Sequence, residues 1–90
     1  MMDLQKGQLI KSKAGRDKDR LFVIIELTDE YVYLVDGSLR KIEKPKKKKI
    51  KHIQPVGVII ETLQDKINND QRILNSEIRK AIHLYETVDK

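Results

Sequence analysis

Short apolar runs, separated by turn-forming and charged residues, occupy the first half of the chain. The clearest run is Leu21-Phe22-Val23-Ile24-Ile25, which is rich in β-branched and aromatic residues and is bounded by charges. A short apolar run with such boundaries is typical of a buried strand. The pattern as a whole predicts strands at residues 7–13, 21–27, 31–35, 38–43 and 50–54.

Two segments between these strands are predicted to be turns or loops. Asp36-Gly37 favours a tight type I′ hairpin, because both central residues of that turn need positive φ. Residues 44–49 join Pro45, which has no N–H group, to four adjacent lysines that repel one another. We therefore expect an extended basic loop there, outside the core, and we expect Pro55 to end the last strand.

The period of the apolar positions changes after Pro55. Val56, Ile59, Ile60, Leu63 and Ile67 recur at steps of three and four residues, which predicts a helix over residues 58–68. Asn75 has the character of an N-cap for a second helix. The apolar stripe of that second helix comprises Ile78, Ala81, Ile82 and Tyr85.

Helices this short do not bury their stripes alone. Packing within the chain is the favoured interpretation, and docking on another protein or on a second copy is the alternative. The predicted fold class is mainly β with a C-terminal α part. A small SH3-like barrel would cover residues 1–55, and a short helical hairpin would follow as an extension at residues 56–90, packed on the barrel or on a partner.

Composition narrows the classes of function. A chain of 90 residues fits one small domain, or a small domain with an appendage, and its modest core leaves little room for an active-site cleft of the usual size. It has no cysteine, which excludes disulfides and thiolate zinc sites. No apolar run approaches the roughly 20 residues of a membrane span. The start, Met1-Met2-Asp3-Leu4-Gln5, has no signal-peptide character, so we expect a cytoplasmic protein.

The charge of the chain is unevenly distributed. The formal net charge is +5, but residues 1–55 hold 14 basic and 8 acidic side chains, a balance of +6. Residues 56–90 hold 5 basic and 6 acidic side chains, a balance of −1. A basic module beside a near-neutral one is the electrostatic pattern of a nucleic-acid binder.

The basic module contains two cationic segments. Lys13–Arg20 is a charged loop with one glycine, and its two aspartates, Asp17 and Asp19, are interpreted as ion-pairing partners that shape the loop. In the second segment, Lys46–Lys49, adjacent lysines destabilise the fold unless a polyanion neutralises them. The predicted RNA-binding residues are Lys11, Lys13, Gly15, Arg16, Lys18, Arg20, Lys44, Lys46, Lys47, Lys48, Lys49, Lys51 and His52.

Tyr31 and Tyr33 lie two residues apart and therefore on one face of their predicted strand. The favoured interpretation places their rings in the core with the hydroxyl groups at its edge. The alternative is a platform on which bases stack.

The order of these features resembles a known family. The strand, the loop Gly15-Arg16-Asp17-Lys18 and the apolar strand after it resemble a KOW motif, found in ribosomal proteins and in the NusG class of transcription factors. The run Pro45-Lys46-Lys47-Lys48 followed by Lys51-His52-Ile53 extends the resemblance over residues 6–54. The segment Ser12-Lys13-Ala14-Gly15-Arg16-Asp17 with its apolar strand more closely resembles eukaryotic-type large-subunit ribosomal protein fourteen and its small bacterial relatives. Asp19 departs from the pattern, because KOW loops often carry a second glycine near that position.

The resemblance implies an SH3-like barrel that binds RNA, with ribosomal RNA as the expected partner. The residues themselves favour contacts to the phosphate backbone, since lysines supply affinity without reading sequence. We expect no enzyme activity, no cofactor and no metal site, because the chain has no glycine-rich phosphate loop, metal-ligand spacing or nucleophile–base pair. The alternative function is a protein-interaction module that docks on ribosomal or transcription machinery, or self-associates through its helices.

Overall fold

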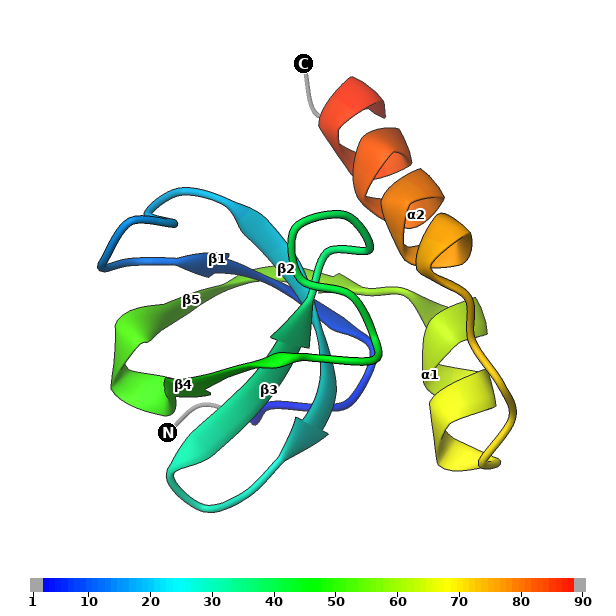
Figure 1. The fold of residues 1–90 in the computed structure, drawn as a ribbon, viewed down its shortest axis with the longest axis horizontal. Coiled ribbons are helices and arrows are strands. Elements are labelled where there is room, and N and C mark those ends of the chain that lie inside the picture. The colour runs from blue at the N-terminus through cyan, green and yellow to red at the C-terminus, as the bar shows by residue number, and fades with distance from the viewer. Residues whose placement is uncertain (1–2, 89–90) are drawn as a thin grey trace.

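The computed structural model describes residues 3–88 and consists of a curled antiparallel sheet with two helices along one side (Figure 1). Met1 and Met2 lie outside the described residues, as do residues 89–90. The expectation of a cytoplasmic protein rests partly on those two methionines. The strands are β1 (Gln8–Ser12), β2 (Leu21–Leu27), β3 (Tyr31–Val35), β4 (Lys46–Lys49) and β5 (Ile53–Ile59). A 3-10 turn (Ile50–His52) precedes β5, and the helices are α1 (Glu61–Asn68) and α2 (Asn75–Val88).

The strands are arranged in the order β4-β3-β2-β1-β5, with every neighbouring pair antiparallel. The first four strands form a meander, and the 3-10 turn then carries the chain from β4 to β5, which returns to pair with β1. Both edge strands thus lie on the same side of the curled sheet (Figure 1). This is the arrangement of a small β-barrel-like domain, and it confirms the predicted fold class of mainly β with C-terminal α.

Strand β2 is buried on both of its faces, which explains its unbroken apolar sequence. Phe22 and Ile24 point into the curl of the sheet, and Val23 between them points to the opposite face, because side chains alternate along a strand. The cluster inside the curl is Ile10, Phe22, Ile24, Val32, Leu34 and Ile53. The cluster on the outer face is Leu9, Val23, Val35, Leu63, Ile78 and Ile82.

The outer cluster joins the helices to the sheet. Ile78 and Ile82 of α2 are buried, and Ala81 and Tyr85 are half-buried against the same cluster. The prediction that this stripe packs within the chain is therefore confirmed. No helix among residues 3–88 combines the length and apolar character needed to cross a membrane.

The strand predicted at residues 38–43 is wrong. The Oδ1 atom of Asp36 accepts the N–H groups of Ser38 at 3.0 Å and of Arg40 at 2.8 Å, which folds this segment into a compact turn. The predicted type I′ hairpin is also wrong, because Asp36 does not have positive φ. The fourth strand is the lysine run itself, and it pairs with β3 from Leu34↔Lys46 to Tyr31↔Lys49.

The predicted strand end at Pro55 and the predicted helix start at residue 58 are also wrong. Pro55 lies inside β5, opposite Ile10 of β1. Among the described residues β5 pairs only with β1, and an edge strand tolerates a proline because one side of its backbone needs no ladder hydrogen bond. The predicted strand at residues 50–54 is thus divided between the 3-10 turn and β5, and α1 begins only at Glu61.

Asn75 is not an N-cap but the first residue of α2. Its Oδ1 atom accepts the N–H of Ile42 at 2.8 Å, and its Nδ2 atom donates to Glu43 at 2.9 Å. The carboxamide is therefore used to fix α2 to the connection between β3 and β4. At the same junction, the carbonyl oxygen of Gly37 accepts a hydrogen bond from the Arg79 guanidinium at 2.5 Å.

Candidate nucleic-acid interface

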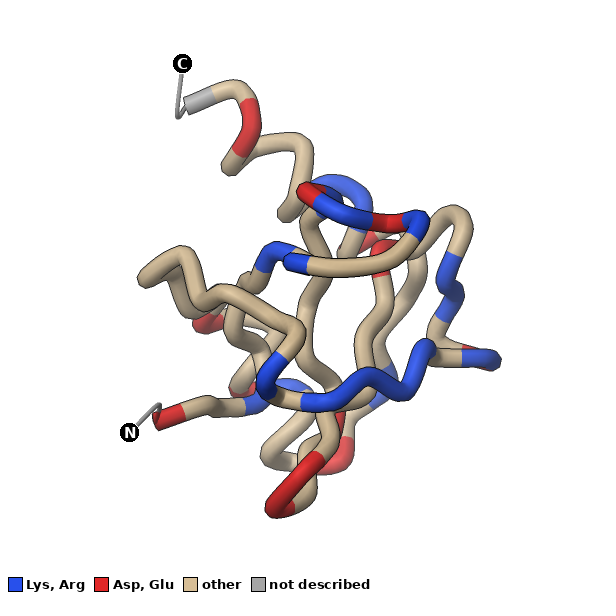
Figure 2. Tube along the Cα trace, turned by 90° about the vertical axis from the view of Figure 1, so that its left-hand side faces the viewer, with Lys and Arg blue, Asp and Glu red and all other residues tan. Residues whose placement is uncertain are grey.

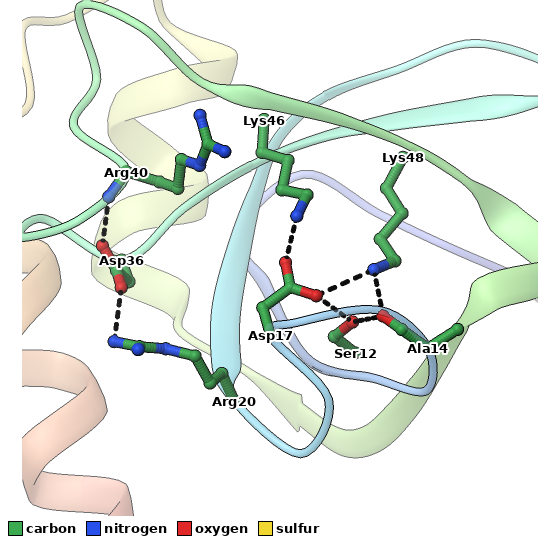
Figure 3. A network of polar contacts seen from close by, with 8 residues as sticks. All are labelled: Ser12, Ala14, Asp17, Arg20, Asp36, Arg40, Lys46 and Lys48. Atoms are coloured by element: carbon green, nitrogen blue, oxygen red, sulfur yellow. Dashed lines mark hydrogen bonds and ion pairs between the residues drawn. The ribbon is translucent and has the colours of Figure 1, made fainter.

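The two cationic segments meet at the carboxylate of Asp17 (Figure 3). The Nζ atom of Lys46 lies 2.5 Å from Asp17 Oδ2, and that of Lys48 lies 3.0 Å from Oδ1. Lys48 also donates to the carbonyl oxygen of Ala14 at 2.7 Å, and the Ser12 hydroxyl donates to Asp17 Oδ1 at 2.9 Å. Two side chains of β4 thus hold the loop between β1 and β2 against that strand.

Asp17 is ionised in this setting. Burial raises the pKa of its carboxyl, but the hydrogen bonds from Lys46, Lys48 and Ser12 outweigh burial and hold that pKa well below the usual range of an aspartate. The interpretation of Asp17 as an ion-pairing residue is confirmed, with partners on β4 rather than within its own loop. The same interpretation is wrong for Asp19, which forms no ion pair within residues 3–88. Asp17 therefore neutralises part of the positive charge of Lys46–Lys49. No external polyanion is needed to neutralise that part.

Two left-handed residues shape the loop backbone. Gly15 has φ of 87°, which a residue without Cβ adopts freely. Asp19, the position at which the sequence departs from the KOW pattern, has φ of 71°. Aspartate is one of the few other residues that enter this region, so Asp19 makes the same kind of turn as a second glycine. Its N–H donates to the carbonyl oxygen of Ser12 at 2.8 Å, which closes the loop.

The lysines of β4 alternate between the two faces of the strand. Lys46 and Lys48 point inward, where the Lys48 side chain is only 9% exposed. Lys47 and Lys49 are exposed on the outer face, opposite Tyr33 and Tyr31 respectively. The prediction of an extended basic loop at residues 44–49 is therefore wrong, because Lys46–Lys49 form a strand, and a strand sends successive side chains to opposite sides.

The two tyrosines share this outer face. Tyr31 and Tyr33 are half-buried and belong to neither core cluster, so the prediction that their rings lie in the core is wrong. The Nζ atom of Lys47 lies 4.3 Å from the centroid of the Tyr31 ring, which is a cation–π contact.

The two cationic segments lie on one side of the molecule. Figure 2 views the left-hand side of Figure 1, and both the loop after β1 and the lysine strand face the reader. The two are also joined near the 3-10 turn, where the Lys13 N–H donates to the carbonyl oxygen of His52 at 2.8 Å. We call this surface the basic face, and its exposed members are Lys13, Arg16, Lys18, Lys47, Lys49 and Lys51.

The other predicted RNA-binding residues have different environments. Lys11 is half-buried on β1, on the strand face opposite Ile10 and Ser12. Lys44 is exposed in the connection before β4, and His52 is half-buried in the 3-10 turn. Arg20 is exposed, but its guanidinium pairs with Asp36 at 3.5 Å.

Sequence reasoning missed two residues beside this surface. Asp36 is 7% exposed and holds both Arg20 and the turn that contains Arg40. The Arg40 side chain extends from that turn away from Asp36 (Figure 3). The available signal was the Asp36-Gly37 pair, because aspartate often accepts hydrogen bonds from the backbone that follows it.

The remaining chemistry of the described chain is limited. Among residues 3–88, no group of three His, Asp or Glu side chains is placed to hold a metal ion.

Comparison of the chain with protein-family models and with curated proteins finds no match.

Proposed function

We propose that this protein binds RNA without acting on it as an enzyme, and that its basic face contacts the phosphate backbone. The observation that carries this proposal is the unpaired charge of that face. All six of its cations are exposed, and within residues 3–88 none of them forms an ion pair. Six free cations on one side of a small domain provide a matching surface for a polyanion.

Asp17 supports the proposal by its position. It fixes the loop of Lys13–Arg20 to β4, so the cations of both segments are presented together before any ligand arrives. A surface ordered in advance loses less conformational entropy on binding. Because five of the six cations are lysines, recognition would rest on charge and backbone shape more than on base sequence. The resemblance to the KOW motif points to ribosomal RNA as the class of RNA partner.

The salt dependence of binding tests this proposal. A fluorescently labelled fragment of ribosomal RNA is titrated with the protein at 50 and 200 mM salt, and anisotropy gives the affinity. If the six cations each neutralise one phosphate, the affinity falls about 10³-fold between the two conditions. Binding that is absent at the lower salt, or equally strong at both, would contradict the proposal.

A further inference from the structure

A cavity of about 370 Å³ lies beside the basic face, between the loop after β1 and the turn after β3. Its cationic lining comes from Arg16, Arg20, Arg40 and Lys46, and its acidic lining from Asp17 and Asp36. The side chain of Leu39, which is 69% exposed, contributes apolar surface, whereas Phe22 in the same lining is only 1% exposed. The volume is at the small end of ligand sites, which suits one nucleotide better than a longer segment.

The charges of this cavity are not balanced internally. Lys46 and Arg20 are each paired with one of the two carboxylates. The guanidinium groups of Arg16 and Arg40 have no carboxylate partner within residues 3–88. The lining of four cations and two carboxylates therefore carries a net charge of +2, and this charge resides on two guanidinium groups that can each bind two oxygens of one anion.

We propose that this cavity binds a phosphate monoester, namely the 5′-phosphate at the end of an RNA strand. This inference rests on the proposed RNA-binding function. A phosphate monoester carries a charge of about −1.5 to −2 at pH 7, which matches the two free guanidinium groups. The phosphate would lie between Arg16 and Arg40, with the sugar and base of the same nucleotide against the exposed side chain of Leu39.

The carboxylates favour an end of the strand over its middle. Asp36 and Asp17 flank the space into which Arg40 and Lys46 extend (Figure 3). A continuous strand would bring further phosphates past these carboxylates, and like charges at close range repel. A terminal phosphate enters without neighbouring phosphates on both sides, so fewer negative charges pass the carboxylates, and its own charge faces the two free guanidinium groups.

The test compares two RNA strands of the same sequence, one with a 5′-phosphate and one with a 5′-hydroxyl group. The native protein should bind the phosphorylated strand about tenfold more tightly, as one additional charged contact predicts. In the double variant Arg16→Gln, Arg40→Gln this preference should disappear. The matched variant Lys47→Gln, Lys49→Gln should weaken binding of both strands equally and keep the preference.

Two further measurements make the outcome decisive. Adenosine 5′-monophosphate, followed by NMR of the arginine Nε–Hε groups, should shift the signals of Arg16 and Arg40, and adenosine should not. The single variant Arg16→Gln, at an exposed position that forms no ion pair within residues 3–88, repeats the strand comparison with little risk to the fold. Equal binding of both strands by native protein, a preference retained in the double variant, or selective binding of a phosphoserine peptide would overturn the inference. Failure of even the 5′-hydroxyl strand to bind would instead defeat the proposed function.

Discussion

Asp17 is the residue on which the position of the basic loop depends. Its carboxylate accepts hydrogen bonds from Ser12 and Lys48 and pairs with Lys46, so it joins the end of β1 and its own loop to the distant strand β4. A buried carboxylate with two ammonium partners is stabilising only while all three groups are present. Removal of the carboxylate would leave two lysines with like charge close together and without a partner.

We expect Asp17→Asn to lower the free energy of unfolding by about 2 kcal/mol, because charge-assisted hydrogen bonds of the carboxylate are lost. Urea unfolding followed by circular dichroism measures this change. Asp19→Asn is the matched control, since Asp19 is exposed and asparagine also adopts positive φ. An equal loss of stability in the two variants would contradict the role of Asp17.

The same carboxylate makes stability depend on pH in the acid range. The pKa of Asp17 is lower in the folded than in the unfolded chain, so the unfolded chain takes up its proton first as the pH falls. The stabilisation is therefore complete above about pH 4, the usual range for an unfolded aspartate, and decreases below it. The difference in unfolding free energy between native protein and Asp17→Asn should shrink from pH 6 to pH 2.5. A difference that stays constant would contradict this assignment.

At the scale of the elements, the sequence predicted the strands and the buried helix stripe that depend on apolar patterns. It missed the features that depend on polar partners far away in the sequence. Strands β2 and β3 followed from apolar runs, and the buried stripe of α2 followed from its period. Strand β4 could not be predicted, because nothing within Lys46–Lys49 reveals that Asp17, about thirty positions earlier, receives its inward side chains. The same holds for Asn75, whose partners Ile42 and Glu43 lie on another element.

The junction between α2 and the turn after β3 provides a test at this scale. Gly37 has φ of 80°, and an added Cβ would overlap the backbone oxygen of Asn75. Gly57 has φ of 76° but no atom near an added Cβ. We expect Gly37→Ala to lose at least about 1 kcal/mol more unfolding free energy than Gly57→Ala, because only the former combines backbone strain with overpacking. Equal losses in denaturant unfolding would show that α2 does not pack tightly there.

At the scale of the molecule, charge and apolar surface are separated. The helices cover the part of the outer face that contains Leu9, Val23 and Val35, and the basic face lies on the other side of the barrel, as the two views show (Figures 1 and 2). The sequence predicted the asymmetry of charge but not which lysines face solvent. That division follows from the alternation of β4, which places Lys47 and Lys49 outward and Lys46 and Lys48 inward.

The affinity of two charge-matched variants for the same RNA fragment tests the central claim most directly. Lys47→Gln, Lys49→Gln removes two cations from the basic face, and Arg72→Gln, Lys80→Gln removes two exposed cations near or on α2. Each lost phosphate contact should lower the slope of log affinity against log salt by about one. The first variant should therefore lose a slope of about two and bind more weakly, while the second binds as the native protein does. Equal affinities and equal slopes for the two variants would contradict RNA binding through the basic face.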